Sequence, residues 1–245
     1  MKINIGLQLY TIRDQMNLGY DEVFKRITEI GYRGVETGFR PDSGEELSKL
    51  LKKYSLKALS AGMGPNNIEN NYDKVKEFMK QVDTSIIVVG FGESDLDTVE
   101  KVVTLARRLD ELAKKVEKDG YVIACHNHWW EFTKRFDGKT ITDVLCENSE
   151  LLKFEMDIGW VTVADADPVK YINELGSRVA LLHVKDFTAD KKHTEAGTGV
   201  VDMKGALSAA SKVGVEWGIV EQDENFRVSS FDSIKTSYDY LKTIL

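Results

Sequence analysis

Short stretches rich in Val, Ile and Leu alternate with segments of helical periodicity along this chain. Between the stretches, apolar residues recur three or four positions apart, most clearly over 96–116, and again over 23–30, 68–82 and 231–241. Weaker helical patterns cover 140–148 and 165–175. The strand-like stretches lie at 3–9, 33–37, 56–62, 85–90, 121–126, 152–157, 179–185 and 218–222. The pattern predicts a strand followed by a helix, repeated around the fold.

No linker rich in Gly, Ser or Pro divides the 245 residues, which contain only three prolines. We therefore expect a single domain over residues 1–245. Repeated βα units in a chain of this length fit a closed (β/α)8 TIM barrel better than an open doubly wound sheet, which has fewer strands. The sequence predicts an α/β protein of the TIM-barrel class.

The charge and the apolar content exclude two classes of partner. A net charge of -7 gives no basic surface for nucleic acid, and no apolar run approaches the roughly 18 residues of a membrane span. The first residues, MKINIGLQLYTIRD, are unlike a signal peptide, and Cys125 and Cys146 form no CxxC pair. We therefore expect a cytoplasmic protein with reduced thiols.

In a TIM barrel the chemistry collects where the strands end, and several predicted strands end on polar residues. A lone charge buried there costs several kcal/mol unless it is paired or bound to a metal. Asp157, His183 and Glu221 offer two carboxylates and an imidazole, a set that suits Mn²⁺, Co²⁺, Mg²⁺ or Zn²⁺. The pattern favours a divalent metal site. The alternative is that each residue caps the backbone or pairs with a neighbouring lysine.

The segment HNHWWEF, residues 126–132, follows the predicted fifth strand and combines histidines with tryptophans. Sugars present C–H faces to aromatic rings and hydroxyls to polar groups, so this mixture suits a carbohydrate pocket. We expect His126 and His128 to face a metal or substrate and Trp129 to form a wall. The alternatives are that one tryptophan packs beneath the loop and that His128 is a structural, hydrogen-bonded histidine.

The order of the motifs resembles the sugar phosphate isomerase/epimerase family, which has the xylose isomerase-like TIM barrel. The resemblance implies a divalent-metal enzyme acting on a sugar, keto-sugar, inosose or polyol, with a homodimer as a possible assembly. From the charge and the apolar content we expect no nucleic acid or membrane partner. It covers nearly the whole chain. The motifs that carry it are GLQLYTIRD, GYRGVE, HNHWWEF, DIGW, LLHVKDF, GTGVVD and IVEQD.

Carried over residue by residue, the resemblance implies metal ligands at Asp157, His183 and Glu221, with Mn²⁺ as the expected ion. Many relatives have a glutamate at the end of the fifth strand, where this chain has His126. The nearest glutamate, Glu131, comes five residues later. Either His126 or Glu131 is therefore the fourth ligand.

The expected chemistry is removal of a proton next to a carbonyl, giving a metal-stabilised enediolate. Glu221 is the first candidate base, and Glu131 or a histidine of the HNH segment, such as His128, returns the proton. Lys185 lies two positions after His183 and either binds substrate or pairs with the neighbouring carboxylates. An inosose or keto-sugar dehydratase, a 3-keto-glycoside lyase and a non-catalytic sugar-binding barrel are the alternatives.

Three further features complete the expected pocket. Trp160 is interpreted as a wall, and Glu36 as a group that orients a ligand or accepts a sugar hydroxyl. The loop FTADKKHTEAGTGVVD is expected to act as a lid, with His193 in solvent. The GTGV run within it lacks the spacing of a phosphate-binding loop, so nucleotide binding is not expected.

Overall fold

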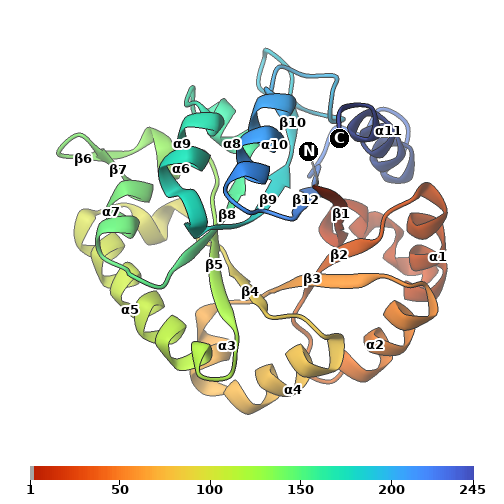
Figure 1. The fold of residues 1–245 in the computed structure, drawn as a ribbon, viewed down its shortest axis with the longest axis horizontal. Helices are drawn as coiled ribbons and strands as arrows, with labels where there is room; N and C mark the ends of the chain where they lie inside the picture. The colour runs from red at the N-terminus through yellow and green to blue at the C-terminus, as the bar shows by residue number, and fades with distance from the viewer. Residues whose placement is uncertain (1–2) are drawn as a thin grey trace.

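Eight parallel strands close into a barrel in the computed structural model, which describes residues 3–245 (Figure 1). Around the barrel the strands follow the order β1, β12, β9, β8, β5, β4, β3, β2. Their bounds are β1 Asn4–Gln8, β2 Gly34–Gly38, β3 Lys57–Gly62, β4 Ile86–Val89, β5 Val122–His126, β8 Lys153–Asp157, β9 Val179–Val184 and β12 Trp217–Val220. All eight predicted strands are present with ends within two residues of the prediction. The predicted fold class is confirmed.

Helices form an outer ring around the strands (Figure 1). The α-helices are α1 Tyr20–Ile30, α2 Gly44–Lys53, α3 Pro65–Asn70, α4 Tyr72–Val82, α5 Val99–Glu117, α6 Trp130–Thr133, α7 Ile141–Glu147, α8 Ile158–Val163, α9 Pro168–Leu175, α10 Met203–Lys212 and α11 Ser230–Ile244. Short 3-10 helices cover Leu9–Leu18, Glu93–Leu96 and Gly176–Arg178. Among residues 3–245, no helix combines the length and the apolar content that crossing a membrane requires.

The continuous helix predicted over 68–82 is wrong, because the segment is split into α3 and α4 at Asn71. Asn71 has φ -135° and ψ 32°, outside the helical region. Asn side chains compete with backbone hydrogen bonds and favour helix ends over helix interiors. Pro65 starts α3 at the first helical position, where its missing N–H is harmless.

Two apolar layers hold the barrel together. Inside it, side chains from the middle of five strands form a small apolar cluster: Leu59, Val88, Ala124, Leu181 and Ile219. Outside it, the larger core packs the strands against the helices, through residues such as Phe24, Phe78 and Met156. In barrels of this class, the functional site lies at the carboxyl ends of the strands. We call this the open end of the barrel.

The strand register brings polar side chains together at that end. Asp157 of β8 is level with His183 of β9, and Glu155 of β8 is level with His126 of β5. On the other side of the barrel, Glu36 of β2 is level with Gln8 of β1 and Ser60 of β3. Two small hairpins extend the loops at this end, β6 Arg135–Phe136 with β7 Lys139–Thr140, and β10 Asp186–Phe187 with β11 His193–Thr194.

Candidate active site

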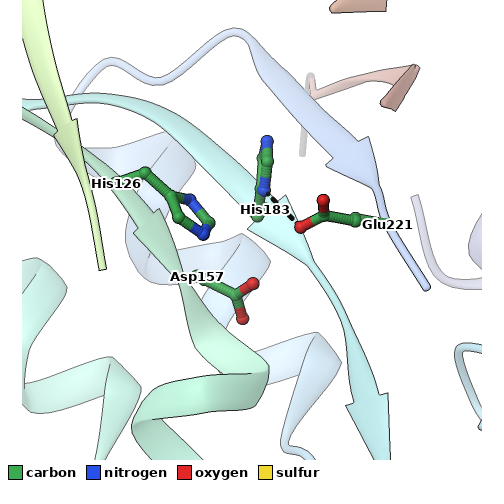
Figure 2. A group of neighbouring side chains, drawn as sticks. All are labelled: His126, Asp157, His183 and Glu221. Carbon is green, nitrogen blue, oxygen red and sulfur yellow. Dashed lines mark hydrogen bonds and ion pairs between the residues drawn. The ribbon is translucent and has the colours of Figure 1, made fainter. Parts of the chain in front are cut away.

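Four side chains from adjacent strands converge at the open end of the barrel, as Figure 2 shows. His126 ends β5, Asp157 ends β8, His183 lies in β9 and Glu221 follows β12. Each offers one ligand atom, and these atoms all lie within 4.8 Å of one another. We call these four residues the metal-ligand group. The structure therefore brings together the three ligands expected from the sequence and, of the two candidates for the fourth, His126.

The local fold around Asp157 explains the DIGW motif. One carboxylate oxygen caps α8 by accepting a hydrogen bond from the Trp160 amide at 2.9 Å, and the Asn127 side chain holds the Asp157 backbone on the neighbouring strand. A Cβ at Gly159 would lie 2.5 Å from the carbonyl oxygen of Lys185, so only glycine fits there. The second oxygen, Oδ2, is buried and makes no hydrogen bond among residues 3–245, although the Lys185 ammonium group lies 3.3 Å from it.

Lys185 is buried beside the metal-ligand group and touches three carboxylates. Its Nζ lies 3.3 Å from Asp157, 2.9 Å from Glu221 and 2.8 Å from Asp223. Burial raises the pKa of Asp157 to about 6, against the opposing charge of Lys185. Burial would also raise the pKa of Glu221, but Lys185 and His183 together hold it well below its usual value. Glu221 is therefore ionised across the physiological range.

A second acidic layer, which the sequence interpretation missed in part, lies next to His183. Glu155 is fully buried, with Oε2 3.2 Å from His183 Nε2 and 3.3 Å from His126 Nδ1. Glu36 is also buried, accepts hydrogen bonds from Gln8 and Ser60, and lies 3.4 Å from His183 Nε2. Burial and the nearby Glu36 charge raise the pKa of Glu155 well above its usual value. Its place two residues before Asp157, on the same face of the strand, was the available signal.

Glu131 lies outside the metal-ligand group. Its carboxylate turns back to accept a hydrogen bond from the backbone amide of His128 at 2.9 Å. Burial raises the pKa of Glu131 to about 8, so the carboxyl group is protonated at neutral pH. Burial, with the Lys185 charge, lowers the pKa of His128 to about 4, and its ring stacks on Trp130 with centroids 4.2 Å apart.

An aromatic cluster lines one side of the site. The ring centroids of Trp129 and Trp160 are 4.8 Å apart, and Trp160 also packs against Phe187 at 4.7 Å. Trp129 is exposed, whereas Trp130 is half-buried and packs against the core. Lys185 Nζ lies 4.9 Å from the centre of the Trp160 ring, which joins this cluster to the metal-ligand group.

The expectation that His193 lies in solvent is wrong. His193 is only 6% exposed, because the β10–β11 hairpin folds its ring against Phe187 at 4.5 Å and Trp160 at 5.2 Å. Asp186 ties down the following loop by accepting hydrogen bonds from the amides of Phe187, Gly197, Gly199 and Val201. Within the GTGV run, the amides of Gly197 and Gly199 thus donate to a carboxylate of the chain itself, and those of Thr198 and Val200 donate to backbone carbonyls.

A cavity of about 230 Å³ opens beside the metal-ligand group, and Glu36, Glu155 and His183 form part of its wall. A larger cavity of about 660 Å³ lies at the opposite end of the barrel, among strand starts such as Lys57, Ile86 and Trp217. Barrels of this class carry their chemistry at the carboxyl ends of the strands. The smaller cavity is therefore the candidate active site.

The metal-ligand group fits a divalent cation. It combines two imidazoles with two carboxylates, a donor set suited to Mn²⁺, Co²⁺ or Zn²⁺. Oδ2 of Asp157 is a buried acceptor that makes an ion pair with Lys185 at 3.3 Å but no hydrogen bond among residues 3–245, so it can still bind a cation. Within residues 3–245, Glu36, Glu155 and His183 form a second set whose ligand atoms also lie within 4.8 Å of one another.

Known proteins resemble this chain over nearly its whole length. An inosose dehydratase of Clostridium beijerinckii is 22% identical over 280 residues, covering 95% of this chain and 93% of that protein. The crystal structure of a sugar phosphate isomerase/epimerase from Parabacteroides distasonis has a TM-score of 0.86 and 18% identity, and covers 99% of this chain and 94% of that chain. A D-allulose 3-epimerase from Methylomonas sp., in complex with D-allulose, has a TM-score of 0.73 and 14% identity, with coverages of 100% and 98%.

At sequence identities this low, the likeness to solved structures establishes only the fold. The family of this chain is established by its match to a family model. The model of the xylose isomerase-like TIM barrel matches residues 24–244, nine-tenths of the chain. The resemblance drawn from the motifs HNHWWEF, DIGW and LLHVKDF is thereby confirmed. The chain belongs to the family of xylose isomerase-like TIM barrels.

Proposed function

We propose that this protein is a divalent-metal-dependent isomerase or epimerase that acts on a ketose, keto-sugar or sugar phosphate. The observation that carries the proposal is the convergence of His126, Asp157, His183 and Glu221 beside a cavity at the carboxyl ends of the strands. Isomerases, epimerases and dehydratases are among the proteins that this chain resembles. Mn²⁺ is the metal proposed.

The metal-ligand group would hold the cation, which when bound polarises a substrate carbonyl and stabilises negative charge on its oxygen. Glu221 is the proposed base, because it lies among the metal-ligand group and its carboxylate is kept ionised by Lys185 and His183. The same two cations make it a weak base, so it can act only on a C–H proton made acidic by a neighbouring carbonyl. Lys185 holds Glu221 and Asp157 in place and presents a positive charge to substrate oxygens. Trp160 gives an apolar wall for the C–H face of a sugar.

Glu131 is the proposed proton donor. A carboxyl group with a pKa of about 8 is protonated at neutral pH, which suits a general acid. Glu221 is ionised because Lys185 and His183 lie beside it, whereas Glu131 is protonated because it is buried without a neighbouring cation. Return of the proton to the same carbon gives epimerisation, and return to the neighbouring carbon gives isomerisation.

A dehydratase is the second candidate, favoured by the likeness to an inosose dehydratase over 95% of this chain. The opening step is the same removal of a proton next to a carbonyl. If a hydroxyl group then leaves from the β position, water is lost and the substrate skeleton is not rearranged.

Incubation of the Mn²⁺-loaded protein with candidate ketoses and inososes in deuterated water tests both functions. We expect NMR to show deuterium at the carbon next to the carbonyl, together with an epimer, an isomer or a dehydrated product. Glu221→Gln should lose at least about a thousandfold in kcat while its circular dichroism is unchanged. A substrate that turns over without exchange, or a Glu221→Gln protein with activity within twofold of wild type, would refute the scheme.

A further inference from the structure

Glu155 is a buried carboxyl group to which the proposed reaction gives no role. It precedes Asp157 by two residues on β8, so both side chains point into the barrel. Its Oε2 lies 3.3 Å from His126 Nδ1 and 3.2 Å from His183 Nε2. These three atoms are buried, and each is without a hydrogen-bond partner among residues 3–245. Buried polar atoms of this kind require an explanation.

The two histidines approach Glu155 through different ring nitrogens. His183 turns Nδ1 toward Glu221, at 2.9 Å (Figure 2). Its Nε2 faces Glu155. His126 turns Nδ1 toward Glu155, which leaves Nε2 as its free nitrogen. A histidine that binds a metal through one nitrogen usually donates the N–H of the other to a carboxylate or carbonyl, which fixes the tautomer and the ring orientation. One carboxyl oxygen is placed to do this for both rings.

We propose that Glu155 is the positioning residue of the metal site: its Oε2 accepts from Nδ1–H of His126 and from Nε2–H of His183. The two rings then present Nε2 of His126 and Nδ1 of His183 to the cation. This inference rests on the proposed function, since it assumes that His126 and His183 are ligands. It explains why a carboxyl group lies fully buried one layer below the metal-ligand group.

Glu155 is flanked on its other side by a second buried carboxyl group. One of its carboxyl oxygens lies within 4.8 Å of one of Glu36. Glu36 in turn accepts hydrogen bonds from the amide of Gln8 and the hydroxyl of Ser60. The strand register supplies this support, because Gln8, Glu36 and Ser60 lie level on three neighbouring strands. A polar chain therefore runs across the barrel interior and ends at the two histidines, so the orientation of the rings is set by several strands at once.

The ring nitrogens that bind metal can be identified in the wild-type protein without an activity assay. We expect long-range ¹H–¹⁵N correlation NMR of the Zn²⁺-loaded, ¹⁵N-histidine-labelled protein to show coordination by Nε2 of His126 and by Nδ1 of His183. The opposite nitrogen of each ring should carry a proton that exchanges slowly. Coordination of either ring through the nitrogen that faces Glu155 would overturn the inference.

Two variants separate positioning from bulk packing. Glu155→Leu keeps the volume and removes the acceptor, whereas Glu155→Gln keeps an acceptor oxygen and serves as the matched control. With both variants folded by circular dichroism, we expect Mn²⁺ affinity, measured by titration calorimetry, to fall about 10- to 100-fold in the Leu variant. The Gln variant should recover most of this loss. Equal affinity in Glu155→Leu and wild type would refute the positioning role.

Failure of this inference differs from failure of the proposed function. If the wild-type protein binds no divalent metal, or if Asp157→Asn and His183→Ala bind it as tightly as wild type, the metal site itself is refuted. If instead the wild type binds two equivalents and Glu155→Leu loses only one, at unchanged affinity for the other, Glu155 is a ligand of a second cation and not a positioning residue.

Discussion

Replacing Glu131 by Gln should remove a pH dependence of stability that is built into the candidate site. Burial raises the pKa of Glu131 from 4.5 to about 8. Between these values the folded protein keeps a proton that the unfolded chain has released, so the free energy of unfolding falls as pH rises and levels off above pH 8. The two pKa values differ by about 3.5 units, and each unit corresponds to about 1.4 kcal/mol, so ionisation of Glu131 can lower the free energy of unfolding by about 5 kcal/mol at most.

Gln retains the shape and the oxygen that accepts from the His128 amide, but it cannot ionise. We expect the two proteins to have similar free energies of unfolding at pH 4.5, and the variant to be more stable by at least roughly 2 kcal/mol at pH 8.5. Urea titrations at several pH values measure both. Glu117→Gln, at an exposed position, is the control and should leave the difference near zero. Parallel plots of unfolding free energy against pH for wild type and Glu131→Gln would refute the reasoning.

Three further predictions follow from the geometry of the site. Since burial raises the pKa of Asp157 to about 6, protons compete with metal below that pH. Calorimetry should show Mn²⁺ affinity falling about fivefold between pH 6 and 5 and by nearly tenfold per unit below, and a flat profile between pH 6 and 5 would contradict this. Asp186→Ala leaves four backbone amides without their acceptor. We expect the free energy of unfolding to fall by roughly 2–4 kcal/mol and proteolysis within residues 188–201 to become faster. An unchanged cleavage rate would show that Asp186 does not hold this loop in place. Trp160→Ala should raise KM for the true substrate about tenfold with little change in kcat. A fall in kcat at unchanged KM would show that the Trp160 ring does not contribute to substrate binding.

The barrel was predictable because its signals are local. Each strand is a short run of branched apolar residues, and long helices such as α5 repeat the apolar spacing over 19 residues. The break at Asn71 was not anticipated, since the apolar spacing continues across it from Ile68 to Val75. The apolar spacing shows which face of the helices is buried. The break between the two helices depends instead on the backbone preference of a single residue, Asn71.

The site was predictable only where strand ends carry the chemistry. Asp157, His183 and Glu221 could be found because each ends an apolar run, but the choice between His126 and Glu131 depends on where the chain turns after β5. The burial of His193 depends on Phe187 and Trp160, which a hairpin and a neighbouring helix bring to it. Such contacts between distant segments leave no periodic trace in the sequence.

On the side of the mouth formed by β2, β3 and β4, glycines lie at or just after the strand ends: Gly38, Gly62, Gly64 and Gly90. A Cβ added at Gly38, Gly64 or Gly90 would meet no atom within 4 Å, and one at Gly62 would meet only a carbonyl oxygen at 3.8 Å. Alanine can therefore be introduced at these positions without repacking the barrel. Gly62, Gly64 and Gly90 line the cavity beside the metal-ligand group, so side chains added there would make that cavity smaller while the opposite wall stays unchanged.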